Sequence, residues 1–329
     1  MNNLSYPKTR LRRNRKADWS RSLVAESSIR KEDLIWPIFV QEGYKKQEEI
    51  KSMPGVYRYT ADLVLKKVEE AKYLGINAVM LFPYTPNNLR TKDGKEAYNE
   101  NNLICKIIRD IKHYISDMGV ITDVALDPYT SHGQDGIVDA NGNVINDKTV
   151  EVLCKQALVL ANAGCDAIAP SDMMDGRIGV IRNALEKCGF IDVQIMAYSA
   201  KYASNFYSPF RDAVGSKNLL GDANKKTYQI DCRNIKEAMT EIALDISEGA
   251  DIIIIKPGMP YLDVIHSASS KFDIPIIAYQ VSGEYSMLKN NSQIFDEKEI
   301  FFESLISFKR AGANAIITYA ALEIVKHID

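Results

Sequence analysis

The chain has 329 residues, of which 46% are hydrophobic and 26% charged, with a formal net charge of −2 at pH 7. This balance is that of an average globular protein and gives no overall attraction to nucleic acid or anionic lipid. No apolar stretch in the sequence approaches the ~20 residues that a membrane-spanning helix needs. The length suits an α/β barrel with an appendage.

The first segment of the chain is strongly basic. Six Lys or Arg side chains lie between Lys8 and Lys16, and Trp19 follows them. Such a run is compatible with an arm that packs on another subunit through Trp19, with a disordered tail, or with a nucleic-acid-binding tail. We favour the arm, and we expect residues 1–30 to form it and residues 31–329 to form the catalytic domain.

Eight short apolar segments predict β-strands. Segments with helical periodicity separate them, most clearly residues 150–162 and 237–247. Eight alternating strands and helices favour a (β/α)8 TIM barrel. The absence of a Gly-x-Gly-x-x-Gly or Walker-type loop weakens the alternative of a doubly wound nucleotide-binding fold. The strands centre on Ile38, Val79, Val124, Ile168, Ile195, Ile254, Ile277 and Ile317.

A recurring pattern precedes four of these strands. A glycine ends the helical segment, and Asp or Asn follows two residues later, at Gly75, Gly164, Gly249 and Gly312. Glycine suits the left-handed position that closes a helix. The pattern therefore predicts one βα unit that is used many times.

A lysine ends the sixth predicted strand. Ile252 to Ile255 form a β-branched run, typical of a strand buried on both faces, and Pro257-Gly258 stop it directly after Lys256. Burial lowers the pKa of a lysine, and a neutral amine forms Schiff bases with carbonyl compounds. Taken alone, Lys256 would more readily be interpreted as a surface lysine just beyond a strand.

A second lysine occupies the matching place on the preceding strand. The apolar segment 193–198 leads through Ser199-Ala200 to Lys201. Two lysines at equivalent strand ends would point into one cavity, and their repulsion would favour the neutral form of one. This pair is the strongest chemical signal in the sequence.

In TIM-barrel enzymes the active residues lie at the carboxyl ends of the barrel strands. The segment at about 203–229 is long, aromatic and rich in Gly, Asn and Lys, and we interpret it as a lid that excludes water. It contains Tyr207, Phe210 and Arg211. The predicted strand ends supply Asp123, Asp127, Ser171, Asp172, Lys201, Lys256, Ser282 and Tyr319.

Three blocks of the sequence stand out: residues 249–261, GADIIIIKPGMPY; residues 169–177; and residues 196–201, continuing through 206–212. Together they resemble the 5-aminolevulinate dehydratase family, also called porphobilinogen synthase, and the first block is similar to the family signature around a Schiff-base lysine. The resemblance extends from the basic N-terminus through Tyr319. It implies a barrel enzyme that joins two molecules of 5-aminolevulinate, with loss of two waters, to give porphobilinogen for tetrapyrrole synthesis.

The resemblance also assigns roles to residues of the predicted site. Lys256 would hold the substrate that becomes the propionate side of the product, and Lys201 the one that becomes the acetate side. Arg211 and Lys225 would bind one substrate carboxylate, whereas Ser282 and Tyr319 would bind the other. Ser171, Tyr207 and Phe210 would complete the substrate site.

The sequence departs from the zinc-dependent members of that family. Where those members carry three cysteines, this chain has Ala125, Asp127 and Asp135, so a zinc-cysteine site of that type is not expected. The pattern resembles the magnesium-using or active-site-metal-free branch. With Asp123, the two aspartates would handle proton transfers or hold a hard cation beside the substrate amine; the alternative is that they cap a loop.

The resemblance further implies a regulatory metal and an assembly. Glu241 matches a glutamate that helps to hold a regulatory Mg²⁺, largely through waters; the alternative is a solvated helix face with Glu237 and Lys236. The basic N-terminal segment resembles the family's arm, which supports a homo-octamer, so we expect no nucleic-acid or membrane partner. The five cysteines form no Cys-x-x-Cys pair, which favours free thiols and a cytoplasmic location.

Two other functions remain as alternatives. A class I aldolase-like barrel would need one Schiff-base lysine and usually a phosphate site, whereas this sequence offers two lysines and a lid with carboxylate-binding residues. A barrel retained only as a regulatory module or scaffold would be expected to lack the lysines or the lid.

Overall fold

The computed structural model describes residues 4–216, 219–221, 223–291 and 293–328. Eight parallel strands form a closed barrel, because each strand pairs with the next and the last pairs with the first. All eight predicted strands are confirmed, and the architecture is the predicted TIM barrel. The strands are β1 (Leu34–Gln41), β4 (Ala78–Tyr84), β5 (Gly119–Val124), β6 (Ala167–Pro170), β7 (Gln194–Lys201), β8 (Ile252–Lys256), β9 (Ile276–Gln280) and β10 (Ala315–Thr318).

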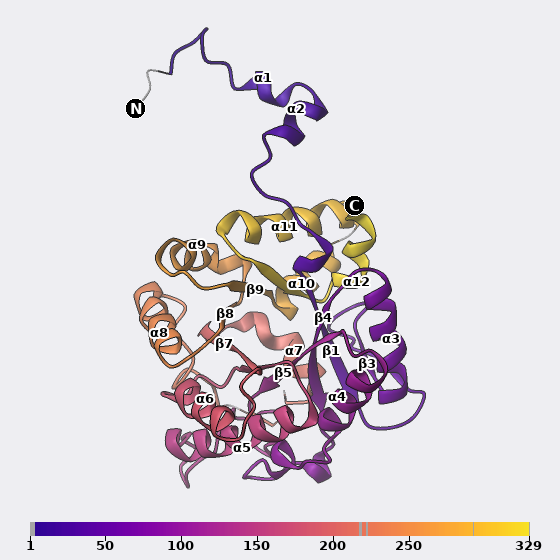
Figure 1. Ribbon diagram of the computed structural model, residues 1–329, viewed down its shortest axis with the longest axis vertical. Coiled ribbons are helices and arrows are strands. Elements are labelled where there is room, and N and C mark those ends of the chain that lie inside the picture. The colour runs from indigo at the N-terminus through magenta and orange to yellow at the C-terminus, as the bar shows by residue number, and fades with distance from the viewer. Residues whose placement is uncertain (1–3, 217–218, 222, 292, 329) are drawn as a thin grey trace.

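Helices surround the barrel (Figure 1). Their apolar residues recur every three or four positions, so that each helix buries one face; in α4 this face includes Ile104, Ile107, Ile108 and Ile111. The helices are α3 (Ala61–Tyr73), α4 (Leu103–Tyr114), α5 (Asn146–Ala163), α6 (Arg177–Lys187), α7 (Ser208–Ala213), α8 (Ile235–Ser247), α9 (Leu262–Lys271), α10 (Ser282–Lys289), α11 (Glu297–Ala311) and α12 (Ala321–Ile324).

The recurring glycine and Asp/Asn pattern has a structural explanation. All four glycines have positive φ, between 98° and 111°, as a helix-ending residue requires. In three of the four copies the acidic or amide side chain accepts a backbone N–H at the start of the preceding barrel strand: Asp166 from Val120, Asp251 from Ile195 and Asn314 from Ile276. The pattern therefore fixes the amino ends of neighbouring strands.

A short hairpin, formed by β2 (Gln47–Glu49) and β3 (Tyr57–Tyr59), pairs with the carboxyl half of β1. Strand β10 pairs with Leu34 and Ile35 of β1, and β3 pairs with Phe39 and Val40 farther along the same strand. Strand β2 pairs antiparallel with β3. Each of these two strands has three residues, which is too short for an alternating pattern to reveal in the sequence.

The N-terminal segment extends away from the barrel (Figure 1). It contains the short helices α1 (Arg12–Arg15) and α2 (Asp18–Leu23), and the side chain of Trp19 is 72% exposed. The hydrophobic core begins at Ile29. This geometry is compatible with the predicted arm, residues 1–30, of which residues 1–3 lie outside the described residues; its packing on another subunit stays a prediction. Across the described ranges, no helix combines the length and apolarity that crossing a membrane would require.

Candidate active site

The two predicted lysines lie side by side at the carboxyl ends of neighbouring strands. Lys201 pairs in register with Lys256, and their residues are only 6% and 5% exposed. The pairing between β7 and β8 is irregular between Ala197 and Ala200. Such a bulge inserts one residue and re-aims the side chains that follow, and here it brings Lys201 level with Lys256. Both lysines line the same small cavity.

Aromatic rings surround the amine of Lys256. Its Nζ lies 4.6 Å from the ring centre of Tyr279, 4.9 Å from Phe210, 5.1 Å from Tyr198 and 5.3 Å from Tyr207. Burial, together with the charge of Lys201, lowers the pKa of Lys256 from 10.5 to about 7. A large share of this amine is therefore neutral, and nucleophilic, at neutral pH. This agrees with the sequence-based argument from desolvation and repulsion.

Lys201 has polar neighbours instead. Its Nζ donates to the backbone carbonyl oxygen of Ser171 and lies 3.9 Å from the carboxylate of Asp135. The same nitrogen lies 6.0 Å from the ring centre of Tyr198. The two amines thus share one cavity, but the surroundings of Lys201 are more polar than those of Lys256.

A third lysine lies between two of the predicted carboxylates. The Nζ of Lys225 donates to Asp127 at 3.1 Å and to Asp135 at 2.9 Å. Burial favours a neutral amine, but the two carboxylates outweigh it and raise the pKa of Lys225. Burial likewise favours a neutral carboxyl at Asp135, but the ammonium groups of Lys201 and Lys225 lower its pKa to about 2. At Asp127, burial prevails and raises the pKa.

Asp123 lies on β5 and lines the same cavity. Burial raises its pKa to about 6, although the charges of Lys201 and Lys256 act in the opposite direction. Its Oδ1 is buried and makes no hydrogen bond to any described residue. Because its pKa lies close to neutral and one oxygen is free, this carboxyl can take up or release a proton inside the cavity.

The predicted lid covers the lysines. It includes α7, and within it residues 217–218 and 222 lie outside the described residues. Phe210 packs edge-on against Phe82, and the hydroxyl of Tyr207 donates to the backbone carbonyl of Lys256 at 3.1 Å. Arg211 and Gln229 also line the cavity. The space left is about 20 Å³, enough for about one water molecule, so the cavity is closed in this arrangement.

The residues predicted to hold the second substrate carboxylate lie close to this cavity and are engaged by the protein. The hydroxyl of Ser282 accepts the N–H of Phe210 at 2.9 Å and donates to the carbonyl of Phe206 at 3.2 Å. The hydroxyl of Tyr319 shares a hydrogen bond of 2.9 Å with that of Tyr279. Ser282 therefore fastens the lid in this closed arrangement, and its role in substrate binding stays a prediction.

Two aromatic residues of the site were missed by sequence reasoning. Tyr198 and Tyr279 lie on β7 and β9, and both are fully buried against the amine of Lys256. Nearly every residue of both strands is buried, so the alternation that separates the inner from the outer face is hidden in the sequence. The one available signal was that Tyr198 precedes Lys201 by three residues.

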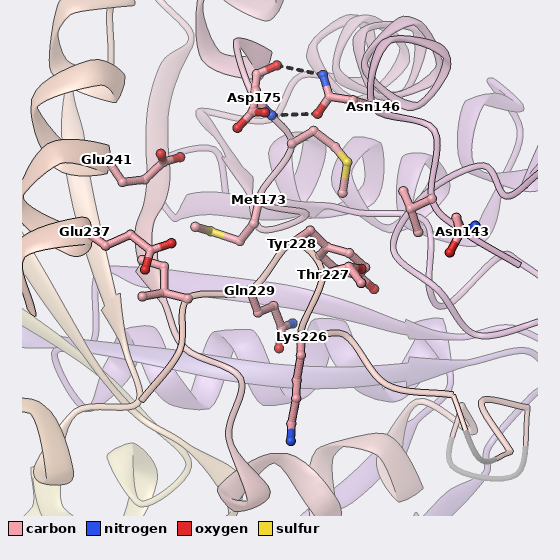
Figure 2. Close-up of a pocket in the computed structure, with 13 residues that line it drawn as sticks. Asn143, Asn146, Met173, Asp175, Lys226, Thr227, Tyr228, Gln229, Glu237 and Glu241 are labelled. Carbon is pink, nitrogen blue, oxygen red and sulfur yellow. Dashed lines mark hydrogen bonds between the residues drawn. The ribbon is translucent and has the colours of Figure 1, made fainter. Parts of the chain in front are cut away.

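Glu241 lines a second, larger cavity of about 330 Å³. Figure 2 shows Glu237 and Glu241 projecting from α8, while Asp175 and Asn146 form a hydrogen-bonded pair elsewhere in the lining. The Oε1 of Glu241 accepts from the guanidinium of the buried Arg177 at 3.1 Å, and burial raises the pKa of this carboxyl. Glu241 is therefore partly buried and paired with Arg177, which disfavours a fully solvated helix face.

Comparison with known proteins gives a consistent result. The family model described as delta-aminolevulinic acid dehydratase matches residues 8–327. The delta-aminolevulinic acid dehydratase of Bradyrhizobium diazoefficiens is 54% identical over 315 residues, covering 95% of this chain and 88% of the relative. That of Methanothermus sociabilis is 48% identical over 326 residues, covering 99% of this chain and 100% of the relative.

A solved structure has the same fold as this chain. It is the delta-aminolevulinic acid dehydratase (porphobilinogen synthase) of Toxoplasma gondii, determined with the reaction product porphobilinogen. The TM-score is 0.95 at 47% sequence identity, covering 97% of this chain and 91% of the other. These matches decide against the aldolase-like and scaffold alternatives. The chain belongs to the delta-aminolevulinic acid dehydratase family.

Proposed function

We propose that this chain is a porphobilinogen synthase, a hydro-lyase that condenses two molecules of 5-aminolevulinate with loss of two waters. The observation that carries the proposal is the pair of buried lysines in one cavity, at the register Lys201–Lys256. Each substrate has one ketone, and two amines in one closed space can hold and activate both ketones at once. Family membership supports the same reaction.

The different surroundings of the amines suit an asymmetric condensation. The neutral amine of Lys256 adds to a substrate ketone, the ketone oxygen takes up protons, and water leaves as the imine forms. Lys201 holds the second substrate in the same way. Asp123, whose pKa is raised by burial to about 6, can supply or accept the protons that these steps exchange.

The lid supplies the remaining contacts in the proposed complex. Arg211 lines the cavity and would bind one substrate carboxylate, whereas Ser282 and Tyr319 would bind the other after the lid closes on a substrate. Lys225 already bonds to Asp127 and Asp135. We therefore propose that it holds these carboxylates in place for proton transfer, in addition to any contact with substrate.

The first test is borohydride trapping with 5-aminolevulinate, alongside an assay of porphobilinogen formation. Hydride reduces an imine to a stable secondary amine, so peptide mapping should locate label on Lys256, Lys201 or both. Because the pKa of Lys256 is lowered to about 7, its labelling rate should rise between about pH 6 and 8 and then level off. An imine that fails to form, or a rate that keeps rising to pH 10, would contradict the proposal.

We also propose that Glu241 helps to hold a regulatory Mg²⁺. Glu237, Asp175 and Asn146 line the same cavity and offer the oxygen ligands that this ion prefers. No group of three or more His, Cys, Asp or Glu side chains within the described ranges is placed to hold a metal ion. Bound Mg²⁺ would therefore rely mainly on waters, and it would supply charge that fixes the residues around the cavity. At Asp127 and Asp135 the ammonium of Lys225 already lies between the carboxylates, so we assign no step there to a metal.

Glu241→Ala, and the milder Glu241→Gln, should retain basal turnover but lose stimulation by Mg²⁺. The Gln variant keeps an oxygen that can accept from Arg177 and thus separates the loss of charge from the loss of that hydrogen bond. Activity would be measured on chelator-treated protein while Mg²⁺ is added back, and thermal stability would be followed in parallel. An unaltered response to Mg²⁺ in both variants would reject the proposal.

We further propose that the N-terminal arm packs on a neighbouring subunit of a homo-octamer in the cytoplasm. Its apolar side chains are exposed in the single chain: Leu4, Tyr6, Leu11, Trp19 and Leu23. Several large apolar side chains exposed on one short segment support a role in contact with another protein surface. Removal of residues 1–18 should lower the assembly state in sedimentation, and an unchanged octamer would contradict the packing role.

A further inference from the structure

Glu284 is a buried acid with no cation partner among the described residues. It lies on α10, is 1% exposed and accepts three backbone N–H groups: Val281 at 2.7 Å, Gly258 at 3.3 Å, and Met259. Burial raises its pKa to about 7. The bond to Val281 is an ordinary helix cap, in which the third helical residue reaches back. The other two bonds cross to a different part of the chain.

Those two donors belong to the turn that follows Lys256. Gly258 and Met259 are the second and third residues after the lysine. This turn is tightly enclosed: a Cβ on Gly258 would lie 2.6 Å from the ring of Phe308 and 3.0 Å from the carbonyl oxygen of Tyr279. The hydroxyl of Tyr207 and the backbone N–H of Tyr202 hold the carbonyl of Lys256 itself at 3.1 and 3.0 Å. Glu284 therefore fixes the backbone that directly follows Lys256 in the chain.

The start of α10 also holds the lid. Ser282, two residues before Glu284, bonds to both Phe206 and Phe210 of the lid. Gly283 lies so close that a Cβ there would be 2.5 Å from the carbonyl oxygen of Phe206. The first turn of α10 thus contacts the lid through Ser282 and Gly283 and the Lys256 turn through Glu284.

We propose that Glu284 is a positioning residue that fixes the backbone turn of Lys256 to the helix start holding the closed lid, so that the amine meets the substrate ketone in reactive geometry. The proposal rests on the proposed function, because it concerns imine formation at Lys256. The ionised carboxylate, which predominates above the raised pKa of Glu284, suits this place since it accepts several N–H groups at once and donates none. An amide would turn an NH2 group toward at least one of the three donors.

The experiment compares Glu284→Gln with Glu284→Asp and with a matched control, Asp33→Asn. Asp33 is another buried carboxylate, 2% exposed, that caps the backbone N–H of Arg30. Unlike Glu284 it also forms ion pairs, with the side chains of Arg30 and Lys309, and it precedes β1 at the opposite end of the barrel from the lysines. Each protein would be trapped with borohydride and 5-aminolevulinate, the rate of labelling at Lys256 would be corrected for the folded fraction, and KM and kcat would be measured.

We expect Glu284→Gln to label Lys256 on the order of 10²-fold more slowly, as for other small displacements of a reacting group. Its kcat should fall more than its KM rises, and Asp33→Asn should keep the labelling rate of the unaltered chain. Glu284→Asp keeps the carboxyl group and can still cap Val281. Its side chain is shorter by one methylene, so the carboxyl group withdraws from Gly258 and Met259. It should fold and label slowly as well.

Each contrary outcome has a distinct meaning. Full labelling rates in both Glu284 variants, or an equal loss in Asp33→Asn, would overturn the positioning role. Failure of both Glu284 variants to fold would assign the residue to stability instead and would also overturn it. Failure of the unaltered chain to form an imine would count against the proposed function, and not against Glu284 in particular.

Discussion

Replacement of Lys256 by methionine should abolish porphobilinogen formation and, at the same time, make the folded chain more stable. Turnover should fall on the order of 10⁴-fold or more, because the nucleophile that forms the imine is gone. Methionine has a similar length and an apolar character, which suits the four aromatic rings that surround the Lys256 amine. Loss of activity would therefore not result from unfolding.

The gain in stability follows from the pKa of Lys256. Burial and the charge of Lys201 lower it from 10.5 to about 7, and one pKa unit corresponds to about 1.36 kcal/mol. Below pH 7 the burial of this amine thus costs roughly 3–5 kcal/mol. Between pH 7 and about 10.5 the unfolded chain binds more protons than the folded chain, so the cost shrinks as the pH rises. The stabilising effect of methionine should be largest at or below pH 7.

Lys201→Met provides the matched control. This variant also loses an imine-forming amine, but Lys201 lies 3.9 Å from Asp135 and donates to the carbonyl of Ser171. Its removal leaves a buried carboxylate with one cation fewer, which destabilises the folded chain. Thermal unfolding across pH should therefore show shifts of opposite sign for the two variants. Equal shifts, or product formation by Lys256→Met, would contradict the assignment.

Removal of both carboxylates that contact Lys225 should have the second largest effect. In the double variant Asp127→Asn/Asp135→Asn, the ammonium of Lys225 would stay buried without the partners that it now contacts at 3.1 and 2.9 Å. Breaking a buried ion pair from one side costs about 3–5 kcal/mol. Activity should fall about 10²–10⁴-fold, since proton transfer by positioned side chains contributes that much.

A triple variant separates stability from catalysis. Addition of Lys225→Met to the double variant removes the unpaired charge, so the melting temperature should recover while activity stays low. Replacing a buried ionic group by apolar side chains of similar volume is often neutral or stabilising. Full activity of the double variant, or of Asp127→Ala/Asp135→Ala, would refute the catalytic role. Recovery of activity in the triple variant would show that only the unpaired lysine was harmful.

The sequence by itself determined the barrel and both lysines. Runs such as Ile252–Ile255 and helix-ending glycines such as Gly249 are local signals, and each is repeated with every βα unit. Because all strands of a parallel barrel present their carboxyl ends to one face, two lysines at strand ends were sufficient to predict a shared cavity. The structure confirms that Lys201 and Lys256 line one cavity.

Only the tertiary structure decided how that cavity is built. The irregular pairing between Ala197 and Ala200 that brings Lys201 level with Lys256, the place of Lys225 between two aspartates and the contact of Glu284 with the Lys256 turn all join residues far apart in the sequence. Such contacts depend on register and on which side chains fill the barrel, and a single sequence does not carry that information locally. Local patterns therefore fixed the positions of the reactive groups, while long-range packing set their charge and orientation.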